Sequence, residues 1–286
     1  MSMGPDRAGP VLVGLIGEGI QGSRSPEMHM READAQGLRL IYQLFDFERM
    51  RRSADDLPAM LDAVELAGFS GVNITHPFKQ QVMAYLDELS EEARQVGAIN
   101  TVLFRAGRRI GHNTDWSGFA EGFERQLGGA ALDHVVQIGA GGAGAATATA
   151  LLRMGCGDLT IVDTQAGRAS TLVERLSGMF TRARLTAGES IGRALDGADG
   201  VVNATPIGMI GHPGMPIEPG LLHGGLWVAD VVYFPLETEL LRTAQSIGCR
   251  TADGGGMAVF QAARAFELFT SLDADRERMV DNFKAR

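Results

Sequence analysis

The sequence predicts an α/β protein with two domains, and three observations support this prediction. Short apolar runs typical of buried strands alternate with helical patterns along the whole chain, as in α/β folds. The chain has 286 residues, enough for two domains of ordinary size. A glycine-rich turn at residues 139–144 follows one apolar run and opens a long helical pattern, so a second α/β unit is expected around it.

The first part of the chain contains the elements of one α/β unit. The apolar run at residues 11–17 ends at a glycine and predicts a buried parallel strand. A helix follows, with Ser25 as its expected N-cap, Pro26 in its first turn and Gly37 at its end. Further elements are expected as strands at 40–47 and 71–75, helices at 54–67, 79–86 and 90–96, and a hairpin at 98–115 turned at Ala106 and Gly107.

The second part of the chain repeats this alternation. Its expected elements are helices at 116–127, 145–155, 169–180 and 237–248, and strands at 135–138, 159–163 and 226–233, with one more ending at 203–204. A last helix at 254–272 follows with no further strand to pair with, so we expect it to return to the first unit. The predicted domains are therefore residues 1–115 plus 250–286, and residues 116–249.

Composition and charge exclude several classes of function. The net charge is −9 with a pI near 5.2, and no basic stripe occurs, so no nucleic-acid partner is expected. No apolar run approaches about 18 residues, so no membrane span is expected. Cys156 and Cys249 lie far apart without metal-ligand spacing, which argues against a metal site and a disulfide. Residues 1–10 resemble a disordered leader and lack a signal-peptide pattern, so we expect a cytoplasmic protein.

The glycine-rich turn indicates a nucleotide site. Gly139, Gly141 and Gly144 match the G-x-G-x-x-G pattern between a strand and a helix rich in small residues. In this context the first glycine makes a tight turn, the second lets a pyrophosphate approach, and the third lets the helix pack closely. The turn as a whole is Gly139, Ala140, Gly141, Gly142, Ala143 and Gly144. The alternative is a tight strand–helix turn that binds nothing; the context favours a Rossmann-type domain for a dinucleotide.

Asp163 ends the next predicted strand, nineteen residues after Gly144. An acid at this spacing accepts hydrogen bonds from the ribose hydroxyls of NAD and repels the additional phosphate of NADP. Arg168 could meet such a phosphate, but it falls where the next helix begins. We therefore expect NAD rather than NADP.

Polar clusters follow several predicted strands in the first part of the chain. They are Ser23–Ser25, Asn73–Thr75 with Lys79, Ile99–Thr101 and His112–Asp115. Each cluster alone could simply cap a helix or make an Asx turn. Together they supply hydroxyls, amides, one ammonium and one carboxylate near strand ends, where open α/β sheets bind ligands. This set suits a small polyol better than a phosphate, because its only arginine is Arg24.

The chain resembles the shikimate/quinate dehydrogenase family over nearly its whole length. The motifs occur in the family's order and spacing: GLIGEGIQGSRSPEMH, GVNITHPFKQQV, GAINTV, GHNTDWSGF, QIGAGGAGAA, VVNATPIGM, DVVYFPLETELL and DGGGMAVFQAA. The resemblance implies an N-terminal α/β substrate domain completed by the C-terminal helix, and a Rossmann-type domain that binds NAD(P). It also implies a hydride-transferring oxidoreductase of the shikimate pathway and aromatic amino acid biosynthesis.

The resemblance assigns roles residue by residue. Lys79 and Asp115 are the implied catalytic pair. The implied substrate-binding residues, for a cyclohexene or cyclohexane carboxylate, are Ser23, Ser25, Asn73, Thr75, Lys79, Asn100, Asp115, Tyr233 and Gln261. The implied cofactor-binding residues beyond the glycine turn are Asp163, Arg168, Ala204, Thr205, Pro206, Val231, Gly254 and Met257.

Departures from the family pattern bear on specificity. Family members that use NADP usually have an Asn-Arg-Thr/Ser run where this chain has Asp163-Thr164-Gln165, which favours NAD. Ser25 stands where quinate-preferring members often have threonine, which favours shikimate over quinate.

The expected function is hydride transfer between NAD(H) and shikimate/3-dehydroshikimate, with quinate/3-dehydroquinate as a further substrate pair. Lys79 would exchange the proton as a general acid–base group, or would only donate a hydrogen bond that fixes the ring. The alternatives are an NADP-preferring biosynthetic shikimate dehydrogenase or an aminoshikimate variant, a dinucleotide sensor without catalysis, and a methylene-tetrahydrofolate-type dehydrogenase. Both a monomer and a homodimer fit the sequence.

Overall fold

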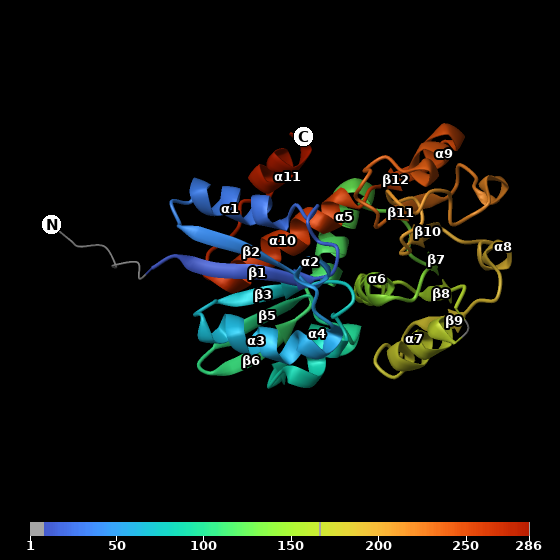
Figure 1. Cartoon of the computed structure of the whole chain (residues 1–286). Coiled ribbons are helices and arrows are strands. Elements are labelled where there is room, and N and C mark those ends of the chain that lie inside the picture. Colours follow the sequence, from blue (N-terminus) through green and yellow to red (C-terminus); the bar gives the residue numbers. More distant parts are fainter. Residues whose placement is uncertain (1–8, 166, 286) are drawn as a thin grey trace. The chain divides into compact units, whose positions relative to one another are not determined.

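The computed structural model describes residues 9–165 and 167–285, so the expectation of a disordered leader falls largely outside the described residues. The contacts divide the chain into two compact units (Figure 1). Unit 1 comprises the residues up to Ser90, Ile99–His112 and the residues from Ala262 onward; unit 2 comprises Glu91–Ala98 and Asn113–Gln261. The prediction of an α/β fold with two domains is confirmed, while the predicted boundaries near residues 115 and 250 stay a prediction.

Unit 1 contains a mixed sheet of order β2-β1-β3-β5-β6-β4. Its strands are β1 (Val11–Gly17), β2 (Leu40–Asp46), β3 (Gly71–Ile74), β4 (Glu88–Leu89), β5 (Thr101–Arg105) and β6 (Arg108–His112). β1 pairs with β2 and β3 in parallel, whereas β5 pairs with β3 and β6 in antiparallel. The predicted hairpin is confirmed: Ala106 and Gly107 have φ of 51° and 71°, the two positive values that a type I′ turn requires.

The helices of unit 1 differ from the predicted ones in several places. They are α1 (Ser25–Ala35), α2 (Phe47–Met50), η1 (Ala54–Asp56), α3 (Leu57–Leu66), η2 (Gln81–Tyr85) and α11 (Arg276–Lys284). The helix expected at 79–86 is only the 3₁₀ turn η2, because Leu86 is already extended on the way into β4. Ser25 is the first helical residue and not the N-cap; Arg24 holds that position without a side-chain cap.

The end of the chain packs on unit 1 through aromatic and charged groups. Helix α10 (Gly255–Thr270) has its residues from Ala262 onward in this unit, and Arg105 donates to the Leu268 carbonyl over 2.6 Å. Buried Glu32 of α1 accepts from Arg278 of α11 over 2.9 and 2.7 Å. Paired in this way, the Glu32 carboxylate avoids the large cost of a buried lone charge. The expected return of the last helix to the first unit agrees with these contacts.

Unit 2 contains a wholly parallel sheet of order β12-β11-β10-β7-β8-β9. Its strands are β7 (His134–Ile138), β8 (Asp158–Val162), β9 (Arg184–Ala187), β10 (Gly200–Asn203), β11 (Trp227–Asp230) and β12 (Arg250–Ala252). Counted from β7, this is the 3-2-1-4-5-6 order of the Rossmann fold. Its helices are α4 (Glu91–Val96), α5 (Asp115–Leu127), α6 (Gly142–Arg153), α7 (Arg168–Ser177), α8 (Ile191–Ala194) and α9 (Glu239–Ile247), with the short 3₁₀ helix η3 (Pro219–Leu221).

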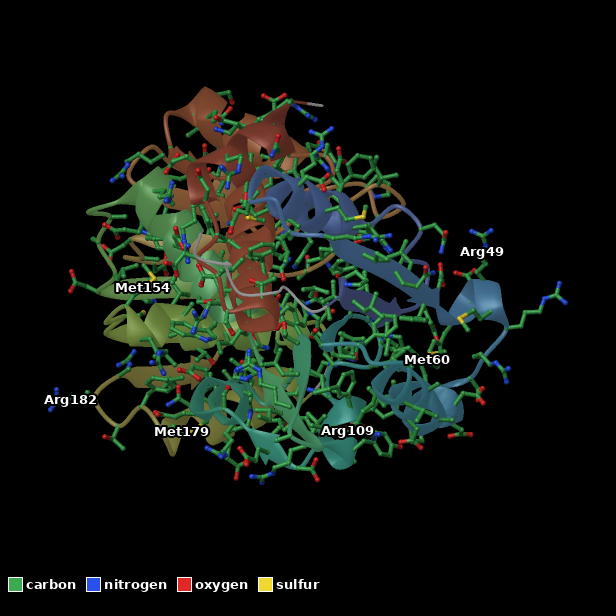
Figure 2. All side chains as sticks on the ribbon, turned by 90° about the vertical axis from the view of Figure 1, so that its left-hand side faces the viewer. Arg49, Met60, Arg109, Met154, Met179 and Arg182 are labelled. Carbon is green, nitrogen blue, oxygen red and sulfur yellow. The ribbon has the colours of Figure 1, made fainter. Side chains whose placement is uncertain are left out.

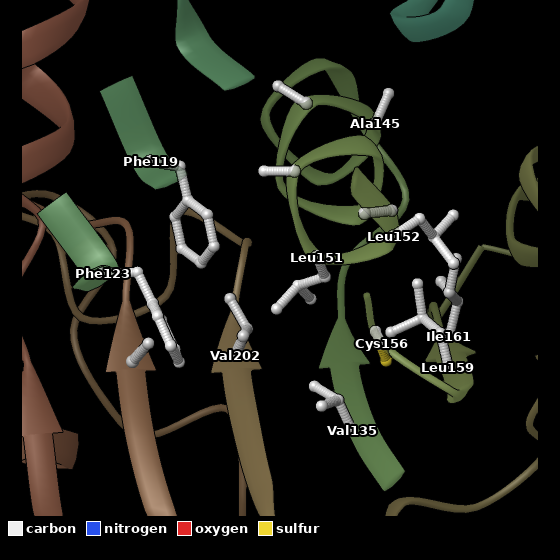
Figure 3. Packing of buried hydrophobic residues seen from close by; sticks show 14 of the residues in the cluster. Phe119, Phe123, Val135, Ala145, Leu151, Leu152, Cys156, Leu159, Ile161 and Val202 are labelled. Atoms are coloured by element: carbon white, nitrogen blue, oxygen red, sulfur yellow. The ribbon is translucent and has the colours of Figure 1, made fainter. Parts of the chain in front are cut away.

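One apolar cluster covers a face of the unit 2 sheet. Figure 3 shows Leu151 of α6 pointing toward the strands that carry Val135 and Val202. Phe123 of α5 packs edge-on against Trp227 with ring centroids 4.9 Å apart, a pair worth about 0.5–1.5 kcal/mol beyond its buried area. Val96 and Ala98 belong to the same cluster, and this packing explains why residues 91–98 group with unit 2.

Among residues 9–165 and 167–285, no helix combines the length and apolar character that crossing a membrane requires. The same residues contain no group of three or more histidine, cysteine, aspartate or glutamate side chains placed to hold a metal ion.

Candidate active site

In unit 1, a carboxylate at the end of β2 shapes the loop between β1 and α1. Asp46 accepts from the backbone N–H groups of Gly19 (3.0 Å) and Ile20 (3.1 Å) and from the Gln21 amide (2.9 Å). Burial acts to raise the pKa of Asp46, but these hydrogen bonds together lower it. Arg49, at the outer surface in Figure 2, holds the other end of the Gln21 side chain over 2.9 Å. These hydrogen bonds therefore fix the first half of the loop, and the loop leads on to Ser23 and Ser25.

Ser23 and Ser25 lie at the start of α1, where each makes a local contact. The Ser23 hydroxyl accepts from the Ser25 N–H over 3.3 Å, and Ser25 also hydrogen-bonds the side chain of Tyr42. Because Ser25 is inside the helix and does not cap it, its hydroxyl is available to groups beyond the helix start. Both serines are half-buried, which suits residues that meet a ligand.

A chain of hydrogen bonds links four polar side chains that lie on, or directly before, strands β2, β3 and β5 of unit 1. We call Tyr42, Asn73, Asn100 and Thr101 the Tyr42 cluster; all four are at most 7% exposed. The Tyr42 hydroxyl donates to the Asn73 side-chain oxygen over 2.8 Å, and the Asn73 side-chain NH₂ group donates to the Thr101 hydroxyl over 3.0 Å. The Thr101 hydroxyl donates in turn to the Asn100 side-chain oxygen over 3.1 Å. The chain fixes the orientation of both amides.

Tyr42 and Thr101 hydrogen-bond the predicted site residue Asn73 although no sequence motif marks them, and both leave a signal. Tyr42 is a polar aromatic at a buried position of the alternating strand β2, and Thr101 stands beside Asn100. Burial raises the pKa of Tyr42, against a smaller opposing effect of its bond to Ser25, so Tyr42 stays a hydroxyl donor. Burial also lowers the pKa of His29, whose ring lies 4.9 Å from that of Tyr42, to about 4, and the Nδ1–H of the neutral ring donates to the Ser25 carbonyl over 2.9 Å.

Lys79 is held by its backbone beside the Tyr42 cluster. Its carbonyl accepts from the Ile99 N–H over 2.7 Å, and the Asn100 carbonyl accepts from the Ile74 N–H over 2.8 Å. Thr75, directly after β3, donates its N–H to the Ile16 carbonyl over 3.0 Å. The structure thus brings Lys79, Asn73, Thr75 and Asn100 to one edge of the unit 1 sheet. Lys79 is one of two lysines in the whole chain, the other being Lys284.

Asp115 begins helix α5 in unit 2 and is only 5% exposed. The helix start is capped by Asn113, whose side-chain oxygen accepts from the N–H groups of Asp115 (3.0 Å) and Trp116 (3.4 Å). The Asp115 carboxylate therefore does not serve as the cap of this helix, and a capping role does not account for it. The Thr114 hydroxyl donates to the Gln261 carbonyl over 3.0 Å, so Asp115 and Gln261 lie on neighbouring helices.

The glycine turn has the geometry that a pyrophosphate requires. Gly139 has φ of 104°, and a Cβ there would lie 2.7 Å from the Ala204 carbonyl. A Cβ on Gly144 would lie 2.2 Å from the Gly139 carbonyl, so only glycine lets α6 begin so close to β7. Gly141 faces open space, because a Cβ there would have no neighbouring atom within 4 Å, as expected where a ligand approaches the N-terminus of α6. These positions fit a dinucleotide.

Asp163 follows β8 and lies directly beside the glycine turn. Its carboxylate accepts from the N–H of Ala140 over 2.8 Å and from that of Gln165 over 2.7 Å. Both oxygens are thereby fixed, and the side chain remains half-buried at the surface. Arg168 is exposed at the first position of α7. The geometry places a fixed negative charge, and not a positive one, next to the turn.

The remaining cofactor-side residues follow the ends of β10 and β11. Ala204, Thr205 and Pro206 follow β10, and Val231 and the 44% exposed Tyr233 follow β11. A small pocket in unit 2 is lined by Phe119, Gly122, Phe123, Ala229, Asp230, Ala252, Asp253, Gly254 and Met257. Gly254 and Met257 are thus brought together with the carboxyl end of β11.

The predicted site residues fall in both units. Unit 1 carries Ser23, Ser25, Asn73, Thr75, Lys79 and Asn100. Unit 2 carries Asp115, Tyr233, Gln261 and all the predicted cofactor-binding residues. The meeting of the two sets in one site stays a prediction.

Comparisons with known proteins agree with this arrangement. Residues 15–102 match the family model described as the shikimate dehydrogenase substrate binding domain. A shikimate dehydrogenase (NADP(+)) of Streptomyces avermitilis is 53% identical over 94% of this chain and 93% of its own length. A quinate/shikimate dehydrogenase (NAD(+)) of Corynebacterium glutamicum strain R is 47% identical over 96% of this chain and 98% of its own.

A solved structure gives the same result for the whole fold. Quinate dehydrogenase from Corynebacterium glutamicum in complex with NAD superposes with a TM-score of 0.92 at 46% identity, covering 97% of this chain and 99% of that one. The chain is a nicotinamide-dinucleotide oxidoreductase by its fold, its motifs and its relatives, and it belongs to the shikimate dehydrogenase family.

Proposed function

We propose that this protein oxidises shikimate to 3-dehydroshikimate with NAD, catalyses the reverse reduction, and acts on quinate as a second substrate. The observation that carries the cofactor preference is the Asp163 carboxylate, held beside the glycine turn by the N–H groups of Ala140 and Gln165. Placed there, it accepts hydrogen bonds from the ribose hydroxyls of NAD and repels a phosphate on that ribose. Arg168 does not offset the charge of Asp163, because it is exposed to solvent at the start of α7.

Bound NAD supplies the hydride acceptor, and the side chains of this chain bind the ring and move the proton. Ser23 and Ser25 bind the substrate carboxylate, while Asn73, Thr75, Asn100 and Gln261 contact its pocket or ring hydroxyls. Tyr233 adds a contact to the carboxylate. These groups are neutral donors and acceptors, which suits recognition of a polyol.

Lys79 takes the proton from the reacting hydroxyl during oxidation and returns it during reduction. Asp115 orients the Lys79 amine and binds the neighbouring hydroxyl. The two residues lie in different units, so this mechanism requires unit 1 and unit 2 to meet around the substrate.

Wider features of the protein follow from the same proposal. We propose a substrate-binding domain of residues 1–115 plus 250–286 and a cofactor-binding domain of residues 116–249. We also propose a cytoplasmic location and a monomeric or homodimeric state. The substrate and the dinucleotide are the only partners that this function needs.

The alternative is an NADP-preferring shikimate dehydrogenase, and one observation favours it. The relative from Streptomyces avermitilis, 53% identical, is named for NADP(+). Initial rates measured with NAD and NADP against shikimate and quinate, at one pH, decide between the two. We expect the highest kcat/KM for NAD with shikimate. A higher kcat/KM for NADP with shikimate would establish the alternative, and no turnover in all four combinations would refute both.

A further inference from the structure

A buried carboxylate with no assigned role ends strand β11. Asp230 is 2% exposed and accepts three hydrogen bonds. The donors are the Asn203 side-chain amide (2.9 Å), the Val232 N–H (3.0 Å) and the Thr238 hydroxyl (2.8 Å). We call Asn203, Asp230 and Thr238 the Asp230 cluster. Asp230 also lines the pocket that contains Gly254 and Met257, yet it is not among the residues that the proposed function uses.

Asp230 determines which way the Asn203 amide points. Asn203 is the last residue of β10 and pairs in register with Asp230. An ionised carboxylate can only accept hydrogen bonds, so Asn203 must present its NH₂ group to Asp230. Its oxygen is thereby turned toward Thr205, whose N–H and hydroxyl donate to it over 3.0 and 2.7 Å. The NH₂ group also donates to the Ile207 carbonyl over 3.1 Å, so one amide shapes residues 204–207.

The same carboxylate shapes the segment after β11. Its bond to the Val232 N–H fixes the turn that carries Val231 and leads to Tyr233. This turn passes close to Gly254, where a Cβ would lie 2.4 Å from the Val231 carbonyl and 2.5 Å from that of Val232. Thr238, the N-cap of α9, accepts from the Leu241 N–H over 3.3 Å while its own proton goes to Asp230. The cluster therefore joins the segment after β10 to the segment after β11 and to the start of α9.

Keeping a charge at this position costs folding free energy. Burial raises the pKa of Asp230 to about 6, although the three hydrogen bonds act to lower it. Since the folded-state pKa lies above the ordinary value of 3.8, ionisation above about pH 6 costs stability that a neutral side chain would not. A role in stabilising the fold does not account for that cost, whereas a role in shaping the loops does.

We propose that Asp230 is a positioning residue for the cofactor. By fixing the Asn203 amide and the Val232 N–H, it holds residues 204–207 and 231–233 in the shape that receives the nicotinamide half of the dinucleotide. The inference rests on the proposed function, because it takes these two segments as cofactor-binding. It extends that function to a residue that touches neither substrate nor cofactor.

The test is the Asp230→Asn enzyme, compared with wild type for the KM of NAD, the KM of shikimate, and Tm at pH 8. Asparagine keeps the shape but replaces one carboxylate oxygen with an NH₂ group, so either the acceptor of Asn203 and Val232 or the acceptor of Thr238 is lost. We expect the KM of NAD to rise about tenfold, the KM of shikimate to change less than twofold, and Tm to be unchanged or higher. Asp199→Asn is the matched control, because Asp199 accepts the His134 N–H over 2.8 Å just before β10, at the opposite end of that strand.

Two results would overturn the proposal. One is a KM of NAD within twofold of wild type. The other is an equal rise of both KM values together with a lower Tm, which a merely structural residue would give. If Asp230→Asn does not fold, Thr238→Val and Thr238→Ser replace it: only Val removes the hydroxyl, so only Val should raise the KM of NAD, and equal KM values in the two variants would refute the role. A wild-type enzyme inactive with both cofactors would instead refute the proposed function itself.

Discussion

Each of the two sheets carries a buried polar cluster, and the two clusters are similar in design but different in charge. In unit 1, the Tyr42 cluster consists of neutral groups, joined by side-chain hydrogen bonds of 2.8 to 3.1 Å. In unit 2, the Asp230 cluster contains a carboxylate that accepts three donors. The neutral Tyr42 cluster avoids the cost of burying a charge, and the orientation of its side chains depends on the hydroxyl of Tyr42. In the Asp230 cluster the carboxylate holds the Asn203 amide in one orientation, but its ionisation lowers the stability of the fold.

This difference matches the two tasks that we propose. A polyol is recognised by neutral donors and acceptors, which unit 1 supplies around the Lys79 ammonium. A dinucleotide is recognised by backbone shape and by one well-placed charge, which unit 2 supplies through its glycine turn, Asp163 and the loops that Asp230 holds. Changes in unit 1 should therefore alter the handling of the substrate, and changes in unit 2 the handling of the cofactor.

The largest effect is expected from Lys79→Ala in unit 1. Loss of the general acid–base group should lower kcat by about 100- to 10,000-fold with little change in the KM of shikimate. Steady-state kinetics with saturating NAD measure it. Lys284→Ala, which removes the other lysine of the chain, is the matched control and should retain full kcat. An intact kcat with a large rise in the KM of shikimate would mean that Lys79 only fixes the ring.

The next largest effect is expected from Asp163→Asn in unit 2. Removing the charge should weaken NAD use relative to NADP, lowering the ratio of their kcat/KM values by about 100-fold, because a charged hydrogen bond and a phosphate repulsion are lost together. Initial rates with both cofactors give the ratio. The KM of shikimate should stay near that of wild type. An unchanged ratio would contradict the role of Asp163 in cofactor selection.

The charge difference between the clusters predicts a pH dependence of stability. The pKa of Asp230 is about 6 in the folded protein against an ordinary 3.8, so its protonated form stabilises the fold below the lower value. That stability is lost as the pH rises through about 6. Relative to Asp230→Asn, wild type should lose on the order of 2 kcal/mol between pH 4 and pH 7. Urea unfolding of both proteins across this range measures the difference in stability. The Asp253 carboxylate, which lines the same pocket, is present in both proteins and so cancels in the comparison.

A smaller effect is expected from Tyr42→Phe. The change keeps the ring against His29 but removes the donor to Asn73, whose amide oxygen then lacks that partner. The KM of shikimate should rise about three- to tenfold and the KM of NAD should not change. Equal changes in the KM of shikimate and the KM of NAD would mean that the Tyr42 cluster does not act on substrate binding alone.

Sequence alone predicted most of the long elements, because their apolar periodicity depends only on local residues. It missed the short strands β4, β9 and β12, which lie at or near sheet edges and bury few side chains. It also missed α11, whose attachment depends on Glu32 meeting Arg278 from the far end of the chain. Residues 91–98 group with unit 2 through packing against its apolar cluster, and such packing is not a local property that the sequence reveals.

The candidate site was predicted in the same uneven way. Motifs mark Lys79, Asp115 and the glycine turn, and the roles assigned to them stay a prediction. No motif marks Tyr42, Thr101 or the link between Asn203 and Asp230, which are neighbours across two parallel strands and lie 27 positions apart in the chain. Such lateral pairs carry no sequence signal, since the register of parallel strands is set by packing of the whole sheet.

A crystal structure of the enzyme with shikimate and NAD tests the central claim most directly, namely that unit 1 and unit 2 each supply one member of the acid–base pair. We predict that the Lys79 Nζ atom lies about 3 Å from the hydroxyl on the carbon that faces the nicotinamide, with the Asp115 carboxylate within the same distance of Lys79 or of the neighbouring hydroxyl. A complex in which Lys79 contacts only the substrate carboxylate, or in which Asp115 lies more than about 6 Å from both the ring and Lys79, would contradict the account.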